Sequence, residues 1–147
     1  MTDTALTGRE YLRVSSDKSG RLRSPEEQHA DNERAGQQHG FILAEPYAEN
    51  EAVSASRYGT KTRGEFGRLV ADLEAGRFGA DLLLLWESSR GSRKVSEWER
   101  LIEACEASGT RIHVTTHART YDCRNARDRR SLREEDAFAF RSDDKVL

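Results

Sequence analysis

The feature that most restricts the possible folds is an uninterrupted apolar run, Leu82-Leu83-Leu84-Leu85-Trp86. A short run of this kind is typical of a strand buried on both faces, as in the middle of a parallel sheet. Apolar side chains recur at helical spacing before and after it, over residues 66–73 and 95–105. We therefore expect a central strand over residues 80–86, with helices packed on both faces of its sheet.

The remaining segments continue this alternation of strand and helix. A capping box, Ser24-Pro25-Glu26-Glu27, starts a helix that should run to about Gln38 and stop at Gly40. A second capping box, Thr62-Arg63-Gly64-Glu65, starts a helix that ends at Gly76. The other expected elements are strands over 8–15, 41–47 and 111–115, a helix from Val95 to Gly109, a polar loop holding Tyr121 and Asp122, and a helix from Asp128 onward.

This order of elements predicts an α/β fold of three layers, with a mostly parallel central sheet and helices on both faces, similar to a Rossmann fold. We expect one domain over residues 1–127 and the start of a long C-terminal helix over residues 128–147. That helix ends on Val146-Leu147 without a cap or a breaker. Its natural chain is therefore expected to continue, or the helix to pack on another subunit.

Composition excludes several classes of protein. The 147 residues suffice for one domain with a core, and the net charge of −2 gives no overall basic field. Two cysteines and four histidines lack the spacing of metal ligands, so neither a metal nor another cofactor is expected. No apolar run approaches the length of a membrane span, and the N-terminus lacks a signal-peptide core, so we expect an intracellular soluble protein.

Serines and arginines gather where the predicted strands end. Ser15 closes the first strand, and Arg13 lies two positions earlier on the same face. The segments after the next two strands supply further residues of both kinds, namely Ser54, Arg63, Arg90 and Arg93. Because the carboxyl ends of parallel strands meet at one edge of a sheet, a serine hydroxyl ringed by guanidinium groups is expected there. Such a site suits a phosphate group, although any one of these arginines alone could be an ordinary solvated residue.

The same residues limit the chemistry of the site. No histidine stands at a spacing that would make it the base of a Ser-His-Asp triad, and no paired carboxylates flank Ser15 as a two-metal site requires. Guanidinium groups can instead stabilise the negative charge that develops as a serine attacks a phosphodiester. Arginine suits this role because its planar fork pairs with two phosphate oxygens at once.

Four motifs in a fixed order resemble those of one protein family. They are Tyr11-Leu12-Arg13-Val14-Ser15, Ser24-Pro25-Glu26-Glu27-Gln28, the segment 51–56 with Arg63-Gly64-Glu65-Phe66, and Ser89-Arg90-Gly91-Ser92-Arg93. Together they resemble the catalytic, resolvase/invertase-type domain of the serine recombinases, and most of all the large serine integrases of phages. The resemblance extends over about residues 10–145, nearly the whole chain.

This resemblance implies a function and a set of site residues. Ser15 would be the nucleophile that cleaves and rejoins DNA through a 5′-phosphoserine intermediate. Arg13, Arg63, Arg90 and Arg93 would bind the scissile phosphate, with Ser54 and Gln28 assisting. Ser56 lies in the same loop as Ser54, which we prefer, and Gln28 could equally be a plain surface residue of its helix.

The resemblance also implies partners and a location. Double-stranded DNA attachment sites would be the substrate of a homodimer that pairs into a synaptic homotetramer, without a metal or another cofactor. Residues 1–127 would be the resolvase-type catalytic domain, and residues 128–147 the truncated start of a dimerisation helix. The expected location is the bacterial cytoplasm, in association with the nucleoid.

The chain departs from the family pattern at two positions. Ser89 precedes Arg90 where the family commonly has aspartate, and the nearest carboxylate is Glu87, so no acid–base role is assigned there. Gly91 stands where the family usually has an apolar residue, which would weaken a helical turn by about 1 kcal/mol.

Other functions fit the sequence less well. The main alternative is a resolvase-like regulatory or assembly module without chemistry. A phosphotransfer domain would need an aspartate at a strand end, but Asp17 lies beyond the first strand and Asp81 precedes the central one. A nucleotide-binding fold would need a glycine-rich loop after the first strand, which this sequence lacks.

Overall fold

A computed structural model describes residues 6–13, 15–16, 22–49, 64–87 and 95–133. The central sheet contains β1 (Leu6–Leu12), β4 (Phe41–Leu43), β5 (Tyr47–Ala48), β6 (Leu82–Leu85), β7 (Arg111–Val114) and β8 (Arg119–Asp122). Its order is β4-β1-β6-β7-β8, and β5 continues beside β1 beyond β4. All pairings are parallel except that of β7 with β8. The expected mostly parallel sheet is therefore confirmed.

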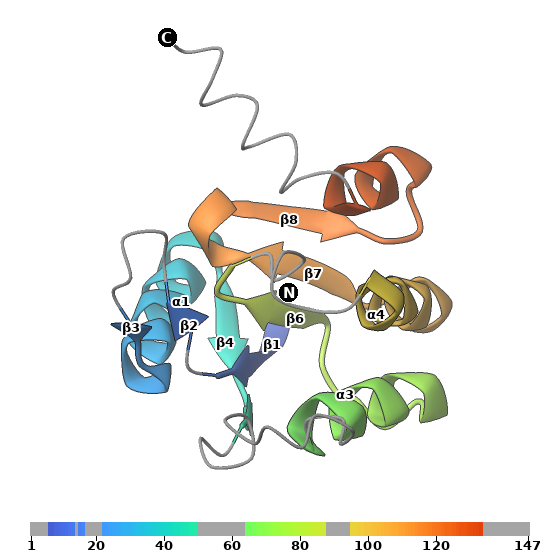
Figure 1. Ribbon diagram of the computed structural model, residues 1–147. Coiled ribbons are helices and arrows are strands. Elements are labelled where there is room, and N and C mark those ends of the chain that lie inside the picture. The colour runs from blue at the N-terminus through green and yellow to red at the C-terminus, as the bar shows by residue number, and fades with distance from the viewer. Residues whose placement is uncertain (1–5, 14, 17–21, 50–63, 88–94, 134–147) are drawn as a thin grey trace, which may run out of the picture.

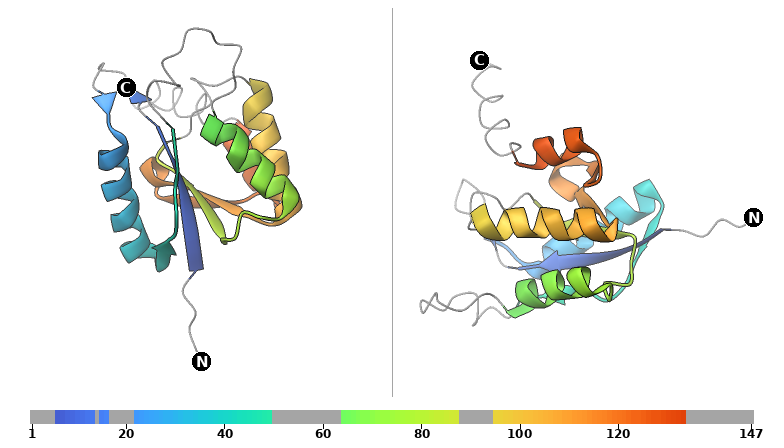
Figure 2. Two further views of the ribbon diagram at one scale, coloured as in Figure 1. Left: turned by 90° about the horizontal axis from the view of Figure 1, so that it is seen from below. Right: turned by 90° about the vertical axis from the view of Figure 1, so that its right-hand side faces the viewer.

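Helices cover both faces of this sheet, as the sequence predicts. Helix α1 (Pro25–His39) lies on one face, and α3 (Gly64–Ala75) and α4 (Val95–Ser108) lie on the other (Figure 1). A view from below shows the sheet between these two helical layers (Figure 2). A further helical segment over residues 126–133 lies on the side of α4. None of the helices within the described ranges is long and apolar enough to span a membrane.

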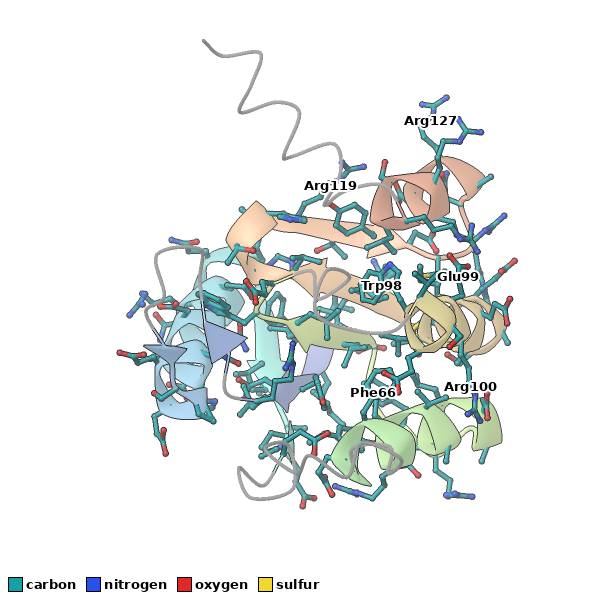
Figure 3. The ribbon with its side chains drawn as sticks, in the orientation of Figure 1. Phe66, Trp98, Glu99, Arg100, Arg119 and Arg127 are labelled. Carbon is teal, nitrogen blue, oxygen red and sulfur yellow. The ribbon has the colours of Figure 1, made fainter. Side chains whose placement is uncertain are left out.

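The apolar run that opens the sequence analysis forms the buried strand β6. All four of its leucines are at most 3% exposed. Leu83 and Leu85 join the large core under α3 and α4, whereas Leu82 and Leu84 join a small cluster under α1. Figure 3 shows Phe66 and Trp98 pointing into the larger core. The two faces of one strand thus belong to two cores of very different size.

Both cysteines are in the larger core. Cys105 and Cys123 are buried and free. The neighbouring Cys123 thiol, together with burial, raises the pKa of Cys105 well above its ordinary value. Cys105 is therefore protonated and serves packing rather than chemistry.

Helix α1 begins and ends where its capping signals indicate. The Ser24 side chain accepts a hydrogen bond from the Glu27 amide, and the Glu27 carboxylate accepts one from the Ser24 amide, which completes the capping box. Gly40 ends the helix in the left-handed conformation, with φ of 83°. The residues Thr62 and Arg63 of the second capping box lie outside the described residues.

The first and second expected strands are each divided in two. The strand expected over residues 8–15 ends at Leu12, and Ser15–Ser16 instead forms β2, which pairs antiparallel with β3 (Leu22–Arg23). The strand expected over residues 41–47 is divided into β4 and β5 around Pro46, which has no amide hydrogen to donate. Strands are therefore present in both expected ranges, but each expected strand is two shorter strands rather than one.

The expected polar loop around Tyr121 and Asp122 is wrong. These residues belong to β8, an antiparallel edge strand in which Tyr121 is buried and the other three side chains are exposed. With a single buried residue, the segment shows almost no alternation of apolar and polar side chains, so its sequence did not predict a strand. The following helical segment begins at residue 126 rather than 128, because the Asn125 side chain accepts a hydrogen bond from the Asp128 amide as an N-cap does. The expected continuation of this helix over residues 134–147 lies outside the described residues.

Gly36 provides a stability test of the contact between α1 and the sheet. A Cβ atom at this position would stand 2.7 Å from the Phe41 carbonyl oxygen and 3.3 Å from the Phe41 ring. Gly36→Ala should therefore lower the free energy of unfolding by about 1–3 kcal/mol in urea denaturation, as overpacking does. Gly64→Ala is the matched control, since a Cβ there meets nothing within 4 Å and alanine favours helix. Equal effects of the two variants would contradict the close packing of α1.

Candidate functional site

The structure describes three of the seven predicted site residues at least in part. Arg13 directly follows β1, Gln28 lies in the first turns of α1, and the backbone of Ser15 lies in β2. The other four, Ser54, Arg63, Arg90 and Arg93, lie outside the described residues, as does the alternative Ser56. The described part of the predicted site is therefore the carboxyl end of β1 and the start of α1.

Gln28 joins these two elements. It is only 2% exposed, so the interpretation of Gln28 as a plain surface residue is wrong. Its side-chain Nε2 donates a hydrogen bond of 2.7 Å to the Arg13 carbonyl oxygen. The helix residue thus holds the main chain directly after β1.

The chain reverses direction beyond Arg13 and returns to α1. In the ladder between β2 and β3, Ser15 is paired with Arg23. Ser24, the N-cap of α1, follows immediately in the sequence. The backbone of Ser15 is therefore brought beside the start of α1, at the carboxyl end of β1, where open α/β sheets bind their ligands.

A buried carboxylate that the sequence analysis did not single out lies two residues before Leu12. Glu10 is fully buried and accepts hydrogen bonds from two α1 side chains, with Oε1 3.0 Å from Asn32 Nδ2 and Oε2 2.6 Å from His29 Nδ1. Burial raises the pKa of Glu10, although the hydrogen bonds from Asn32 and His29 act in the opposite direction. Burial also opposes the charged form of His29, but its contacts with Glu10 and Glu33 outweigh burial and raise its pKa. β1 and α1 are thus joined by hydrogen bonds between polar side chains.

A second buried carboxylate occupies the opposite face of β1. Glu49 Oε2 accepts a hydrogen bond of 2.7 Å from the Tyr11 hydroxyl and one of 3.0 Å from the Phe66 amide. The Phe66 amide belongs to the first turn of α3, where helix amides have no partner within the helix. Glu49 therefore ties the start of α3 to β1, the strand that leads into Arg13. The first motif contributes to this contact through its tyrosine, whereas nothing in the sequence pattern identified Glu49.

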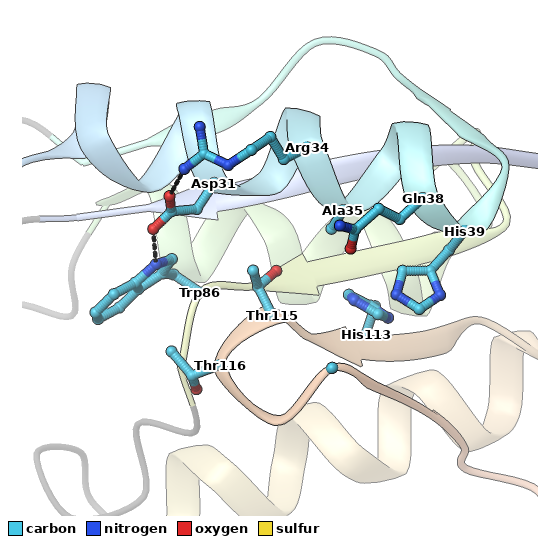
Figure 4. A pocket seen from close by; sticks show the side chains of 10 residues that line it. Asp31, Arg34, Ala35, Gln38, His39, Trp86, His113, Thr115 and Thr116 are labelled. Carbon is cyan, nitrogen blue, oxygen red and sulfur yellow. Dashed lines mark hydrogen bonds and ion pairs between the residues drawn. The ribbon is translucent and has the colours of Figure 1, made fainter.

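A cavity of about 260 Å³ lies beside α1 (Figure 4). Its lining includes Asp31, Trp86, His113 and Thr115. His113 is fully buried; its Nδ1 lies 2.8 Å from the Thr120 hydroxyl, whereas its Nε2 has no hydrogen-bond partner in the described structure. Burial, and to a lesser extent the charge of His39, lowers the pKa of His113 to about 4. His113 is therefore neutral at pH 7.

Among the described residues, no group of three or more histidine, cysteine, aspartate or glutamate side chains could hold a metal ion. The described residues place three features near the end of β1: the Arg13 carbonyl oxygen held by Gln28, the Ser15 backbone beside the start of α1, and the buried carboxylates of Glu10 and Glu49, which contact the flanking helices.

The fold is a mostly parallel α/β domain, and the described residues of the predicted site lie at the carboxyl end of β1 and the start of α1. The chain belongs to the resolvase family, because the family model of the resolvase N-terminal domain matches residues 10–139. The match includes Arg13, Ser15 and Gln28, and it confirms the catalytic-domain family of the serine recombinases that the sequence motifs resemble. No curated protein sequence matches the chain closely enough to be counted as a relative.

Two solved structures share the fold. A resolvase family site-specific recombinase from Streptococcus pneumoniae has a TM-score of 0.61 at 16% identity, over 96% of this chain and 91% of that chain. The N-terminal catalytic domain of TP901-1 integrase has a TM-score of 0.63 at 19% identity, over 96% of this chain and 99% of that chain. Both similarities establish the resolvase-like three-layer fold.

Two of the buried tyrosines, Tyr11 and Tyr121, allow a test of the Glu49 contact. Tyr11→Phe removes a hydrogen bond to a carboxylate and should lower the free energy of unfolding by about 1.5–3 kcal/mol. Tyr121→Phe is the control, because the Tyr121 hydroxyl contacts an imidazole nitrogen of His117 at 3.0 Å rather than a carboxylate, and should cost about 1 kcal/mol. Urea denaturation of both variants measures the difference, and a smaller loss for Tyr11→Phe than for Tyr121→Phe would contradict it.

His113 predicts a dependence of stability on acid. The unfolded chain binds a proton at this histidine near pH 6.5, whereas the folded chain resists it until about pH 4. The stability that neutral His113 provides is therefore fully present above pH 6.5 and is lost as the pH falls toward 4. Unfolding free energies measured across this range should fall more steeply for the wild type than for His113→Asn. In NMR titrations, His113 should change its shifts near pH 4 and His29 above 6.5, and the reverse order would contradict both assignments.

Proposed function

We propose that this domain cleaves and rejoins DNA as the catalytic domain of a site-specific recombinase, with Ser15 as the nucleophile. The observation that carries the proposal is the match to the resolvase N-terminal domain over residues 10–139, which includes Ser15. The position of the Ser15 backbone beyond the carboxyl end of β1 supports it further.

The proposed reaction exchanges one phosphodiester for another. Ser15 Oγ loses its proton and forms a bond to the phosphorus of a DNA phosphodiester, and the bond from phosphorus to the 3′ oxygen breaks. The 3′ oxygen takes up a proton, so that the products are a 5′-phosphoserine ester and a free 3′ hydroxyl. Rejoining is the reverse attack by a 3′ hydroxyl, and because the ester keeps the bond energy, the cycle needs no ATP.

Arginine side chains are proposed to supply the catalytic charge. Arg13 follows β1 directly, and the hydrogen bond from Gln28 to its carbonyl oxygen fixes the main chain from which its side chain extends. Arg63, Arg90 and Arg93 complete the proposed phosphate site, and Ser54 assists. Guanidinium groups that are held in place before reaction stabilise a developing phosphorane without reorganisation, which is commonly the largest contribution to catalysis. Metal ions have no part in this mechanism.

The proposal extends to assembly and location. Recombination requires two DNA sites, so we propose a homodimer on each attachment site and a homotetramer when the sites pair. Residues 128–147 are proposed as the start of the dimerisation helix, after a catalytic domain over residues 1–127. The substrate places the protein with the bacterial nucleoid in the cytoplasm.

Removal of the Ser15 hydroxyl oxygen tests whether Ser15 is the nucleophile. Wild-type protein is incubated with a pool of random-sequence DNA duplexes, quenched with denaturant and examined for DNA that stays attached to protein. The wild type should form an adduct at a 5′ end, and Ser15→Ala should abolish it, because no other group replaces the missing oxygen.

The neighbouring Ser16→Ala is the matched control and should retain the adduct. An adduct that persists in Ser15→Ala would exclude Ser15 as the nucleophile. A wild type that binds DNA without forming any adduct would instead favour a resolvase-like module for regulation or assembly.

A further inference from the structure

The face that α1 turns toward the sheet is unusually polar. The residues buried along it are Gln28, Asn32, Ala35 and Gly36. Apolar packing is confined to the later part of the helix, where Ala35 joins a cluster with Phe41, Leu82 and Leu84. The first half of α1, which lies beside Ser15, is therefore held mainly by hydrogen bonds.

These hydrogen bonds reach the ends of three neighbouring strands. Gln28 donates to the Arg13 carbonyl oxygen after β1. Asp31 Oδ2 accepts from the Trp86 indole Nε1 after β6, at 2.9 Å (Figure 4). Asn32 Oδ1 accepts from the Thr115 hydroxyl after β7, at 2.6 Å. We refer to Gln28, Asp31 and Asn32 as the polar face of α1.

Glu10 anchors the polar face to the middle of the sheet. The Asn32 side-chain nitrogen donates a hydrogen bond to Glu10 Oε1, and its side-chain oxygen accepts one from the Thr115 hydroxyl. One side chain therefore connects β1 with the residue after β7. Asn32 and Glu10 are both fully buried. If a buried polar group loses its hydrogen-bond partner, the folded state is destabilised by the free energy of desolvating that group. The contacts of Asn32 with Glu10 and with Thr115 therefore stabilise each other.

We propose that the polar face of α1 is a positioning element that fixes the ends of β1 and β6 relative to each other. This inference rests on the proposed function, because β1 leads into the segment of Arg13 and Ser15, and β6 into that of Arg90 and Arg93. Directional hydrogen bonds set this separation, whereas apolar contacts alone would allow the helix to slide. A displacement of the reacting groups by about 1 Å can slow a reaction on the order of a hundredfold.

Asp31 provides the cleanest set of variants, because it is partly exposed and its replacement leaves the core intact. Asp31→Ala removes the acceptor for Trp86, whereas Asp31→Asn keeps an acceptor oxygen. Arg34→Ala removes the exposed ion pair between Arg34 and Asp31 and keeps the Asp31 carboxylate as the acceptor for Trp86. Asn32→Leu breaks the central contact, and Leu132→Ala in the helical segment 126–133 is a control that destabilises the opposite helical layer.

Two measurements on the whole chain test the proposal. The first is the rate of adduct formation at saturating concentrations of the same random-sequence duplexes, together with the DNA concentration for half-saturation. Asp31→Ala and Asn32→Leu should lower the rate at least about tenfold and leave the half-saturating concentration unchanged. Asp31→Asn, Arg34→Ala and Leu132→Ala should stay within about threefold of the wild type.

The second measurement is hydrogen exchange of two backbone amides, which requires no activity. The Glu49 amide donates to the Leu12 carbonyl oxygen at 2.8 Å, and the Thr116 amide donates to the Trp86 carbonyl oxygen at 2.9 Å. They report on the ends of β1 and β6. Both should exchange faster in Asn32→Leu, and the Thr116 amide should exchange faster in Asp31→Ala but not in Leu132→Ala.

The outcomes separate this inference from the proposed function. Wild-type rates in both Asp31→Ala and Asn32→Leu, or an Asp31→Asn variant as slow as Asp31→Ala, would overturn the positioning role. Absence of any adduct in the wild type would refute the proposed function. The amide exchange rates would still decide whether the polar face of α1 holds the strand ends.

Discussion

The structure depends on the burial of β6 on both of its faces. Four consecutive leucines cannot be shielded by one layer, so helices must pack on each side of the sheet. Parallel pairing with β1 and β7 follows from this arrangement, and parallel strands align their carboxyl ends at one edge. Every residue that the proposed chemistry uses from the described chain lies at that edge or just beyond it.

The two helical layers hold the sheet by different physical means. The layer of α3 and α4 packs through a large apolar core that includes Leu69, Trp98 and Ile102. Among the described residues, the layer of α1 has a cluster of four buried apolar residues and relies on buried polar groups near its start. Apolar packing is tolerant in direction, whereas hydrogen bonds are not, so the polar layer is the one that can define geometry at the site. The buried carboxylates of Glu10 and Glu49 show that β1 is fixed from both sides.

Sequence patterns predicted the elements that carry strong local signals. The leucines of β6, the capping box of α1 and the apolar spacing of α3 and α4 were sufficient to predict the layers and the mostly parallel sheet. The edge strand β8 was missed because only Tyr121 faces inward. The division between β1 and β2 was missed because the hydrogen bond from Gln28 that holds the chain after Arg13 joins residues far apart in the sequence.

The candidate site was predictable only where a local motif marks its residues. Gln28 was identified from its place in a motif, and its burial then explained why that residue type is needed. The contacts of Glu10 with His29 and Asn32 depend on the alignment of α1 over β1, which no local pattern encodes. Charged residues in a sequence suggest surface by default, and only the tertiary arrangement reveals that Glu10 and Glu49 are interior.

The edges of the sheet have a consequence for self-association. On one side, β8 presents the charged side chains of Arg119 and Asp122 to solvent, and its run is only four residues long. On the other side, Pro46 breaks the edge between β4 and β5, so the described residues there offer no long ladder of free amides and carbonyls. Short, charged and interrupted borders discourage a second sheet from adding on. For the homodimer and homotetramer proposed above, such borders favour contacts other than sheet-to-sheet fusion, which can be made and released.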